Sequence, residues 1–283
     1  RLSQRIINAM TVDVEDYFHV GAFENTISRD DWDQLPCRVE RNTNRSLELF
    51  ERYNIKATFF VLGWVCERYP ALIRKIHELG HEVASHSIDH KRVSNLSRAE
   101  FVEDITKSKK LLEDTIGVAV IGYRAPSFSI GQDNIWALEC LKEAGYLYSS
   151  SVYPIRHDHY GMPDAPRFAF NPLTRSEFLE MPVTTFEFMN MKLPCGGGGY
   201  FRLLPYPISK FAMKRVNEND EEACIFYFHP WEIDPDQPRQ HNASLKSKFR
   251  HYTNLDVMEK KIERLLVDFR WGRMDDVFLR RND

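Results

Sequence analysis

Short apolar runs alternate with amphipathic segments along the first half of the chain. The apolar runs predict β-strands at residues 6–14, 56–63, 81–86, 118–126 and 146–152. Between them, apolar residues recur every three or four positions, a period that predicts α-helices at 44–53, 70–80, 97–117 and 134–145. Gly80, Gly117 and Gly145 stand where these helices should end, since glycine readily takes the left-handed cap conformation. The alternation predicts an α/β fold with a mostly parallel sheet, closed as a barrel or open and doubly wound.

The second half of the chain has a less regular pattern. Residues 153–172 are rich in Pro, His, Asp and Tyr, and the glycine run in 195–207 interrupts any period, so both stretches predict long loops. Residues 222–232 predict a late strand and 253–271 a final amphipathic helix. Long ordered loops in such folds often shape a substrate cleft at the carboxyl ends of the strands. With no linker or repeat, a single domain over residues 1–283 is the simplest organisation.

Composition narrows the possible functions. A 283-residue chain that is 43% hydrophobic can bury a large core. Its 38 basic and 41 acidic residues are well mixed, so the sequence offers no cationic face for nucleic acid. No apolar run approaches the ~20 residues of a membrane span.

The number and spacing of the cysteines indicate a cellular location for the protein. Five cysteines lie far apart with no CxxC pair, a pattern typical of reduced thiols in a cytosolic protein, so we predict a cytoplasmic location. The first residue is Arg rather than Met, so an upstream export segment stays an open alternative.

Polar residues with catalytic potential stand where four predicted strands end. They are Asp13, Glu15 and Asp16 after the first strand, His86 and His90 after the third, Arg124 after the fourth, and His229 after the late strand. In parallel sheets these positions open onto a common cleft. They bring carboxylates, imidazoles and a guanidinium to one place.

The two histidines and the three acids indicate a metal. Three residues separate His86 from His90, a spacing that places both imidazoles on one side of a helical turn, where a carboxylate would complete a three-ligand site. Three acids within four residues repel one another unless a cation neutralises them. Surface histidines and solvated loop acids are the simpler alternatives. Arg124 could orient a carboxylate or form an ordinary salt bridge, and His229 could be a structural histidine.

Taken in order, these segments resemble the polysaccharide deacetylases with NodB homology, also called carbohydrate esterase family four. TVDVED resembles the first family motif, HSIDH the H(S/T)xxH motif, RAPSFS the arginine motif and FHPWE the late histidine motif. DVEDYFHV, SVYPIRHDHYGMP and HPWEIDP resemble the subgroup associated with bacterial exopolysaccharide synthesis. The resemblance implies a deformed (β/α) barrel with fewer than eight regular strands and a C-terminal extension from about residue 235.

The resemblance also implies roles for individual residues. Asp13 corresponds to the general base, Arg124 to the arginine that orients it, His229 to the general acid, and His86 and His90 to metal ligands. The third ligand is Glu15 or Asp16, because position 14 is Val; a shared strand face favours Glu15, and the following turn favours Asp16, which we prefer. Ser149 stands where relatives tend to have an acid, and Glu232 could replace that acid geometrically.

The implied activity is hydrolysis of an N-acetyl group on a glycan. The implied cofactor is a divalent metal, with Zn²⁺ favoured and Co²⁺, Ni²⁺ or Fe²⁺ as alternatives, and it would polarise the acetyl group and activate a water. Hydrolysis of a small cyclic amide or ureide, or glycan binding without catalysis, are alternative functions. His81, His157 and His159 carry no spacing signal. Sugar rings could stack on loop aromatics, chosen from Tyr153, Tyr160, Phe168, Phe170, Phe186, Tyr200, Phe201 and Trp231.

Overall fold

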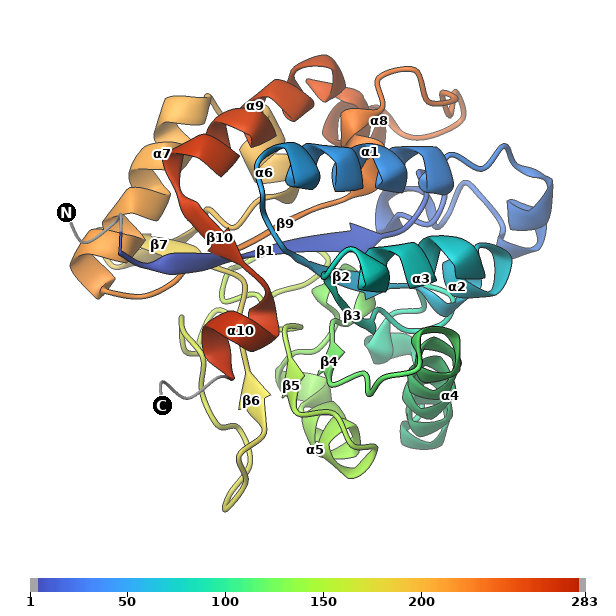
Figure 1. The fold of residues 1–283 in the computed structure, drawn as a ribbon, viewed down its shortest axis with the longest axis horizontal. Coiled ribbons are helices and arrows are strands. Elements are labelled where there is room, and N and C mark those ends of the chain that lie inside the picture. The colour runs from blue at the N-terminus through green and yellow to red at the C-terminus, as the bar shows by residue number, and fades with distance from the viewer. Residues whose placement is uncertain (1–4, 280–283) are drawn as a thin grey trace.

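A curled sheet of parallel strands forms the centre of the protein in the computed structural model, which describes residues 5–279 (Figure 1). Strand β1 (Ile7–Val14) pairs with three strands, with β9 on one side and with β2 and β10 on the other. The remaining strands follow from β2 in the order β3, β4, β5 and β6. Their bounds are β2 (Thr58–Val61), β3 (Glu82–Ser85), β4 (Gly122–Tyr123), β5 (Tyr148–Ser149), β6 (Leu179–Glu180), β9 (Ile225–Phe228) and β10 (Arg270–Gly272).

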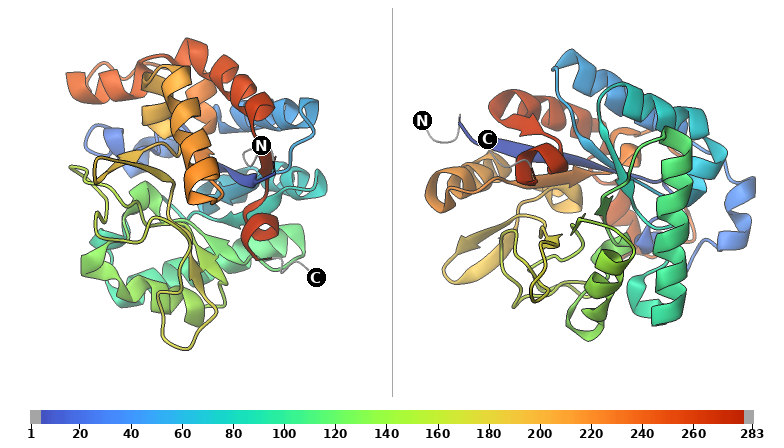
Figure 2. Two further views of the ribbon diagram at one scale, coloured as in Figure 1. Left: turned by 90° about the vertical axis from the view of Figure 1, so that its left-hand side faces the viewer. Right: turned by 60° about the horizontal axis from the view of Figure 1, so that its bottom comes forward.

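Helices surround this sheet as an incomplete ring, visible in the right-hand view of Figure 2. They are α1 (Val39–Arg52), α2 (Gly63–Arg68), α3 (Pro70–Glu78), α4 (Arg98–Ile116), α5 (Trp136–Glu143), α6 (Gly198–Leu203), α7 (Tyr206–Arg215), α8 (Leu245–Tyr252), α9 (Leu255–Asp268) and α10 (Met274–Phe278). Because helices or loops cover both faces, all four residues of each of β2, β3 and β9 are buried. The fold is the expected deformed α/β barrel, built as a curled parallel half-barrel.

The open side of the barrel, between β6 and β9, is bridged by irregular chain. The backbone N–H of Ile225 donates to Oγ1 of Thr184 at 2.6 Å, and that of Tyr227 donates to the carbonyl of Gly196 at 2.8 Å. Gly197 has φ of +115°, and a Cβ there would lie 2.1 Å from the carbonyl oxygen of Tyr227. Only glycine therefore lets this segment approach β9 so closely. Beside it, β7 (Thr185–Phe188) and β8 (Met191–Pro194) form a separate antiparallel hairpin.

Most predicted elements are confirmed, and the three helix-ending glycines have positive φ. Two predictions are wrong. Residues 195–207 are not a loop, because α6 begins inside the glycine run and α7 follows. The last predicted helix ends at Asp268, and Arg270–Gly272 instead forms a strand beside β1. In contrast, residues 153–172 contain no helix and no named strand, as expected.

Candidate active site

Three side chains that follow β1 and β3, the two strands on either side of β2, form a possible metal site. Glu15 follows β1 directly, and His86 follows β3. The Nε2 atoms of His86 and His90 lie 3.3 and 2.9 Å from Oε2 of Glu15, and all three side chains are buried. Among residues 5–279, this is the cluster of acids, histidines or cysteines with spacing suited to a metal ion.

The chain between the two histidines is not helical, which corrects the expected helical turn. Residues 86–90 form a tight irregular loop in which Ser87 and His90 have φ of +71° and +59°. Left-handed backbone at residues with a Cβ is uncommon and costs free energy, so it is retained where the surroundings require it. Here the turn reverses the chain and brings His90 back toward His86.

The donor set fits a divalent metal. Nδ1 of His86 lies 2.8 Å from the carbonyl oxygen of Arg124, so Nδ1 carries the proton and Nε2 presents a lone pair. Oε2 of Glu15 is buried without a hydrogen-bond partner. A buried carboxylate oxygen needs compensation, which a cation bound between the three donors would supply.

Asp16, the preferred third ligand, has a different place. Its carboxylate accepts hydrogen bonds from the backbone N–H groups of Tyr17, Arg38 and Val39, at 2.7 to 2.9 Å. These contacts cap the start of α1, where a negative charge is favourable. The structure therefore corrects the choice of Asp16: Glu15, on the face of β1 that it shares with Asp13, joins the histidines.

Asp13 lies beside this cluster and is paired with a buried arginine. Nη1 of Arg124 donates to Oδ1 of Asp13 at 3.0 Å and to Oγ1 of Thr11 at 2.7 Å. The guanidinium is also held by Ser150, whose carbonyl and hydroxyl each accept a hydrogen bond at 3.0 Å. Arg124 thus fixes Asp13 in one orientation.

His229 faces the same cleft from the end of β9. Its Nε2 lies 3.7 Å from Oδ2 of Asp13 and 3.5 Å from Oε1 of Glu15, while its Nδ1 lies 2.8 Å from Oε1 of Glu232. Burial acts to lower the pKa of His229, but the carboxylates of Glu15 and Glu232 outweigh it and raise the pKa to about 9. The contact with Glu232 orients the ring so that Nε2 points into the cleft.

The sequence suggests that Glu232 could replace the acid that relatives tend to have at position 149. Glu232 does contact His229, whereas Ser149 does not. The Ser149 hydroxyl bonds to Ser151 at 2.7 Å, on the far side of Arg124. The other oxygen of Glu232 accepts from Nε of Arg202 at 2.9 Å. Sequence reasoning missed Arg202, because nothing near the glycine run marks an arginine as part of a site.

The rings of Trp231 and His251 form a stack with the imidazole of His229. Trp231 stacks against His229 at a centroid distance of 5.3 Å and against His251 at 3.9 Å. Of the loop aromatics proposed to stack on sugars, Tyr160 and Trp231 line cavities beside the cleft, whereas Tyr153 and Phe201 are buried in the core. His81 is structural, since its Nδ1 accepts from the backbone N–H of Ala57 at 3.0 Å.

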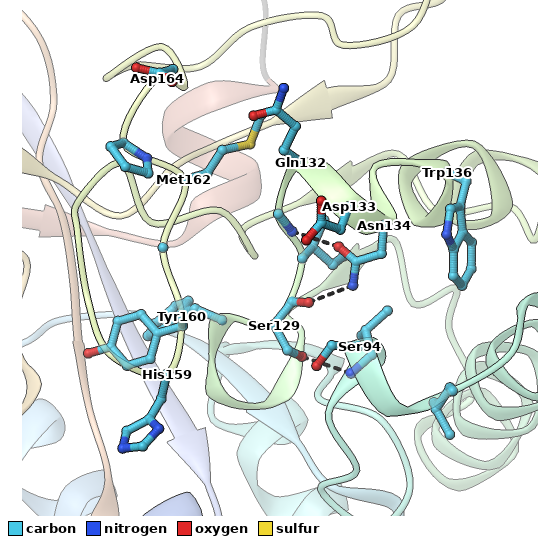
Figure 3. Close-up of a pocket in the computed structure, with 17 residues that line it drawn as sticks. Ser94, Ser129, Gln132, Asp133, Asn134, Trp136, His159, Tyr160, Met162 and Asp164 are labelled. Carbon is cyan, nitrogen blue, oxygen red and sulfur yellow. Dashed lines mark hydrogen bonds between the residues drawn. The ribbon is translucent and has the colours of Figure 1, made fainter.

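Three cavities meet around Phe128, which belongs to the RAPSFS motif that begins at Arg124. A cleft of about 130 Å³ contains the three metal-binding side chains, Asp13 and His229. A second cavity of about 440 Å³ shares Phe128 and His229 with it. A third of about 620 Å³ lies between the loop that carries His159 and Tyr160 and the segment with Ser129 and Asn134 (Figure 3).

Comparison with known proteins divides the chain near its middle. Residues 30–149 match the polysaccharide deacetylase family, and residues 150–279 match a domain of unknown function, DUF3473. A peptidoglycan-N-acetylglucosamine deacetylase of Bacillus cereus is 33% identical over 104 residues, which are 37% of this chain and 47% of the relative. A peptidoglycan deacetylase of Helicobacter pylori is 28% identical over 152 residues, 53% of this chain and 51% of the relative. The matches span about half the length of these relatives.

Solved structures share the fold at low sequence identity. A putative polysaccharide deacetylase from Mycobacterium smegmatis aligns with a TM-score of 0.61 and 18% identity, over 97% of this chain and 89% of its own. PuuE allantoinase aligns with the same TM-score and coverage at 14% identity. BA3943, a pseudoenzyme of carbohydrate esterase family four from Bacillus anthracis, aligns with a TM-score of 0.51 and 15% identity, over 98% of this chain and 66% of its own.

Proposed function

We propose that this chain, which belongs to the polysaccharide deacetylase family and carries a C-terminal DUF3473 region, removes N-acetyl groups from a glycan and releases acetate. The observation that carries the proposal is the convergence of three groups in one cleft. Glu15, His86 and His90 offer ligands to a metal; Asp13 is held by Arg124; and His229 faces both from the opposite side. Amide hydrolysis needs such a metal site, a base and an acid.

The side chains divide the proton transfers between them. A divalent metal held by Glu15, His86 and His90 would polarise the acetyl carbonyl and acidify water. Asp13, oriented by Arg124, takes a proton from the attacking water. His229 donates a proton from Nε2 to the sugar nitrogen as the C–N bond breaks, so the products are acetate and a free amine.

Zn²⁺ is the metal we propose. Two imidazole nitrogens and one carboxylate form a set that zinc hydrolases use, with further positions left for water and substrate. The same donors also suit Co²⁺, Ni²⁺ and Fe²⁺. Metal analysis of protein purified without added metal identifies the native ion.

The proposed substrate is an N-acetylated exopolysaccharide or a related sugar chain. The loop features resembling the exopolysaccharide-associated subgroup, and the two cavities flanking the cleft, support a chain of sugars over a single small molecule. The unpaired state of all five cysteines supports the proposed cytoplasmic location. No helix within residues 5–279 is long and apolar enough to span a bilayer.

Two alternative activities compete with this proposal. The shared fold of PuuE allantoinase makes ring opening of a cyclic ureide the nearest one. The BA3943 pseudoenzyme shows that the fold also exists without activity. The complete set of metal donors, base, orienting arginine and acid in this chain favours catalysis.

One experiment separates the three. Purified metal-loaded protein is incubated with N-acetylglucosamine oligomers and, separately, with allantoin, and acetate release and ring opening are measured. We expect acetate from the oligomers alone, and none from the Asp13→Asn variant with its metal retained. Ring opening without acetate release would support the ureide hydrolase, and metal-loaded protein inactive on both substrates would contradict the proposed deacetylation.

A further inference from the structure

The cavity next to the metal cleft has a wall built from both halves of the chain. It shares Val20, Gly21, Ser127, Phe128, His229 and Trp231 with the cleft, so a substrate whose N-acetyl group reaches the metal site extends directly into it. At about 440 Å³, it has room for more than one sugar unit. The groups on its wall therefore meet the unit next to the one that reacts.

Cations predominate on this wall. Outside the Arg202–Glu232 pair, the charged residues among the described lining are Arg92, Lys246, Arg250 and the carboxylate of Glu24. Asp158, beside the cavity, lies 2.9 Å from Lys246 and 3.7 Å from Arg250. Even with Asp158 included, three cations face two carboxylates, so the wall keeps a net positive charge although the whole chain has a formal charge of −3.

Arg92 is the least exposed of these three cations and is held in place. Its Nε donates to Glu24 at 3.0 Å and its Nη1 to the carbonyl of His159 at 3.1 Å, and only about 13% of its side chain is exposed. Within residues 5–279, no hydrogen bond is found from Nη2. The guanidinium is thus oriented by two contacts and keeps a donor available.

The available donor lies at the junction of the cavity and the cleft. A Cβ at Gly21 would lie 2.9 Å from Nη2 of Arg92 and 3.0 Å from Oγ of Ser127. Gly21 and Ser127 line both spaces. The missing side chain at position 21 therefore leaves room for the guanidinium beside the path of the substrate.

Two exposed cations of the cavity lining lie on α8. Lys246 and Arg250 are four residues apart, so both project from one side of the helix, and their side chains are 62% and 39% exposed. Exposed ion pairs such as those with Asp158 are weak and exchange readily for a ligand carboxylate. His157 adds no charge there at neutral pH, because burial and the cation of Arg250 lower its pKa to about 4.

We propose that this cavity is a subsite for an acidic sugar, a unit bearing a carboxylate next to the N-acetylated unit that is hydrolysed. Arg92 binds the carboxylate with its free Nη2, and Lys246 and Arg250 attract it from α8. The inference rests on the proposed deacetylase function and specifies its substrate as an anionic glycan.

The test uses one oligosaccharide in two forms. Oligosaccharides of alternating N-acetylglucosamine and glucuronic acid are compared with the same chains after reduction of each carboxylate to a hydroxymethyl group. Binding is measured by calorimetry with the metal-loaded Asp13→Asn protein, and acetate release with the unmodified protein. We expect the acidic form to bind about tenfold more tightly at low salt, with a lower KM, and the preference to shrink as salt is added.

Single substitutions test which cations of the cavity wall cause the preference for the acidic oligosaccharide. Arg92→Gln should abolish most of the preference for the acidic form. Lys246→Gln, at an exposed position with no buried contact, should reduce it about threefold, and it remains informative if loss of the Arg92 contacts unfolds the loop. Lys248→Gln is the matched control, because Lys248 lies on the same helix and does not line the cavity.

The outcomes separate this inference from the function on which it rests. Equal binding of the two forms, or binding of neither, overturns the acidic subsite. A preference unchanged in both Arg92→Gln and Lys246→Gln overturns it as well. Acetate release from neutral N-acetylglucosamine oligomers alongside either result leaves the deacetylase proposal standing, whereas charge-selective binding without acetate release from any chain contradicts only that proposal.

Discussion

The two sides of the cleft are built differently. On the metal and base side, Asp13 lies at the end of β1 and Glu15 follows it, while the two histidines follow β3 and Arg124 follows β4, and all five side chains are fully or nearly fully buried. On the acid side, His229 is partly exposed, and it is positioned through Glu232 and Arg202 from the DUF3473 region. One side is fixed by strand pairing and the other by a chain of buried ion pairs.

Arg202 extends this chain of contacts to the C-terminal helices. Its Nη2 donates to the carbonyl of Arg250 at 2.6 Å, and its Nη1 to that of Thr253, both near the junction of α8 and α9. Since the same arginine holds Glu232, the position of His229 depends on helices far along the chain. His229 and the two side chains that position it therefore all lie within residues 150–279, the part of the chain that matches DUF3473.

The largest expected effect on activity comes from substitution of Asp13, the proposed general base. Asp13→Asn keeps the shape of the side chain and removes its basicity, so kcat should fall by about 10³-fold or more. Metal content should not change, because Asp13 is not among the three grouped ligands. Acetate release and metal analysis on the same preparation check both points, and activity near that of the unmodified protein would exclude Asp13 as the base.

The next effect distinguishes the two adjacent acids. Glu15→Gln removes a charged ligand and should weaken metal binding by about 100-fold, measured by competition with a chelator. Asp16→Asn should instead destabilise the fold by about 1–3 kcal/mol, through its loss of charge at the start of α1, and leave metal affinity intact. A loss of metal affinity in Asp16→Asn and not in Glu15→Gln would instead identify Asp16 as the third ligand.

A smaller effect tests the acid side. Glu232→Gln leaves a buried Arg202 without its partner charge and loosens the orientation of His229, so kcat should fall by about 10- to 100-fold while KM and metal content change little. Glu232→Asp, which keeps the charge at a shorter reach, should recover part of the loss. Equal activity of all three proteins would show that the ion-pair chain does not position His229.

The smallest effect on activity is expected at the opposite end of the sheet. Glu82 starts β3, and burial, aided by the charge of Asp275, raises its pKa to about 8. The folded protein therefore holds a proton that the unfolded chain releases above about pH 4.5, and the part of the free energy of unfolding that Glu82 contributes should fall as the pH rises from about 5 to 8.

The Glu82→Gln variant removes this dependence. Urea unfolding at pH 5 and pH 8 should show a loss of stability at the higher pH in the unmodified protein and a smaller one in the variant, with deacetylation unchanged at neutral pH. An equal change in stability between the two pH values in both proteins would contradict the assigned protonation of Glu82.

Short-range patterns in the sequence were enough to predict the parallel sheet and several residues of the candidate site. The alternation of apolar runs with helical periods predicted the parallel sheet, and the polar residues at strand ends predicted that Asp13, His86 and His229 share a cleft, whereas Arg124 is buried and contacts it through its hydrogen bond to Asp13. Both follow from rules that act over a few residues or that hold for all parallel sheets: a strand's period, a helix's period and the meeting of carboxyl ends at one edge.

Tertiary structure decided the rest. The choice between Glu15 and Asp16 depends on where α1 begins, since its backbone N–H groups bind Asp16 and leave Glu15 for the histidines. The strand at Arg270–Gly272 forms because β1 leaves an open edge, and Arg202 reaches Glu232 across 30 positions of sequence. Such contacts join segments that are distant in the chain, and no local pattern records them because their free energy exists only once both partners are packed together.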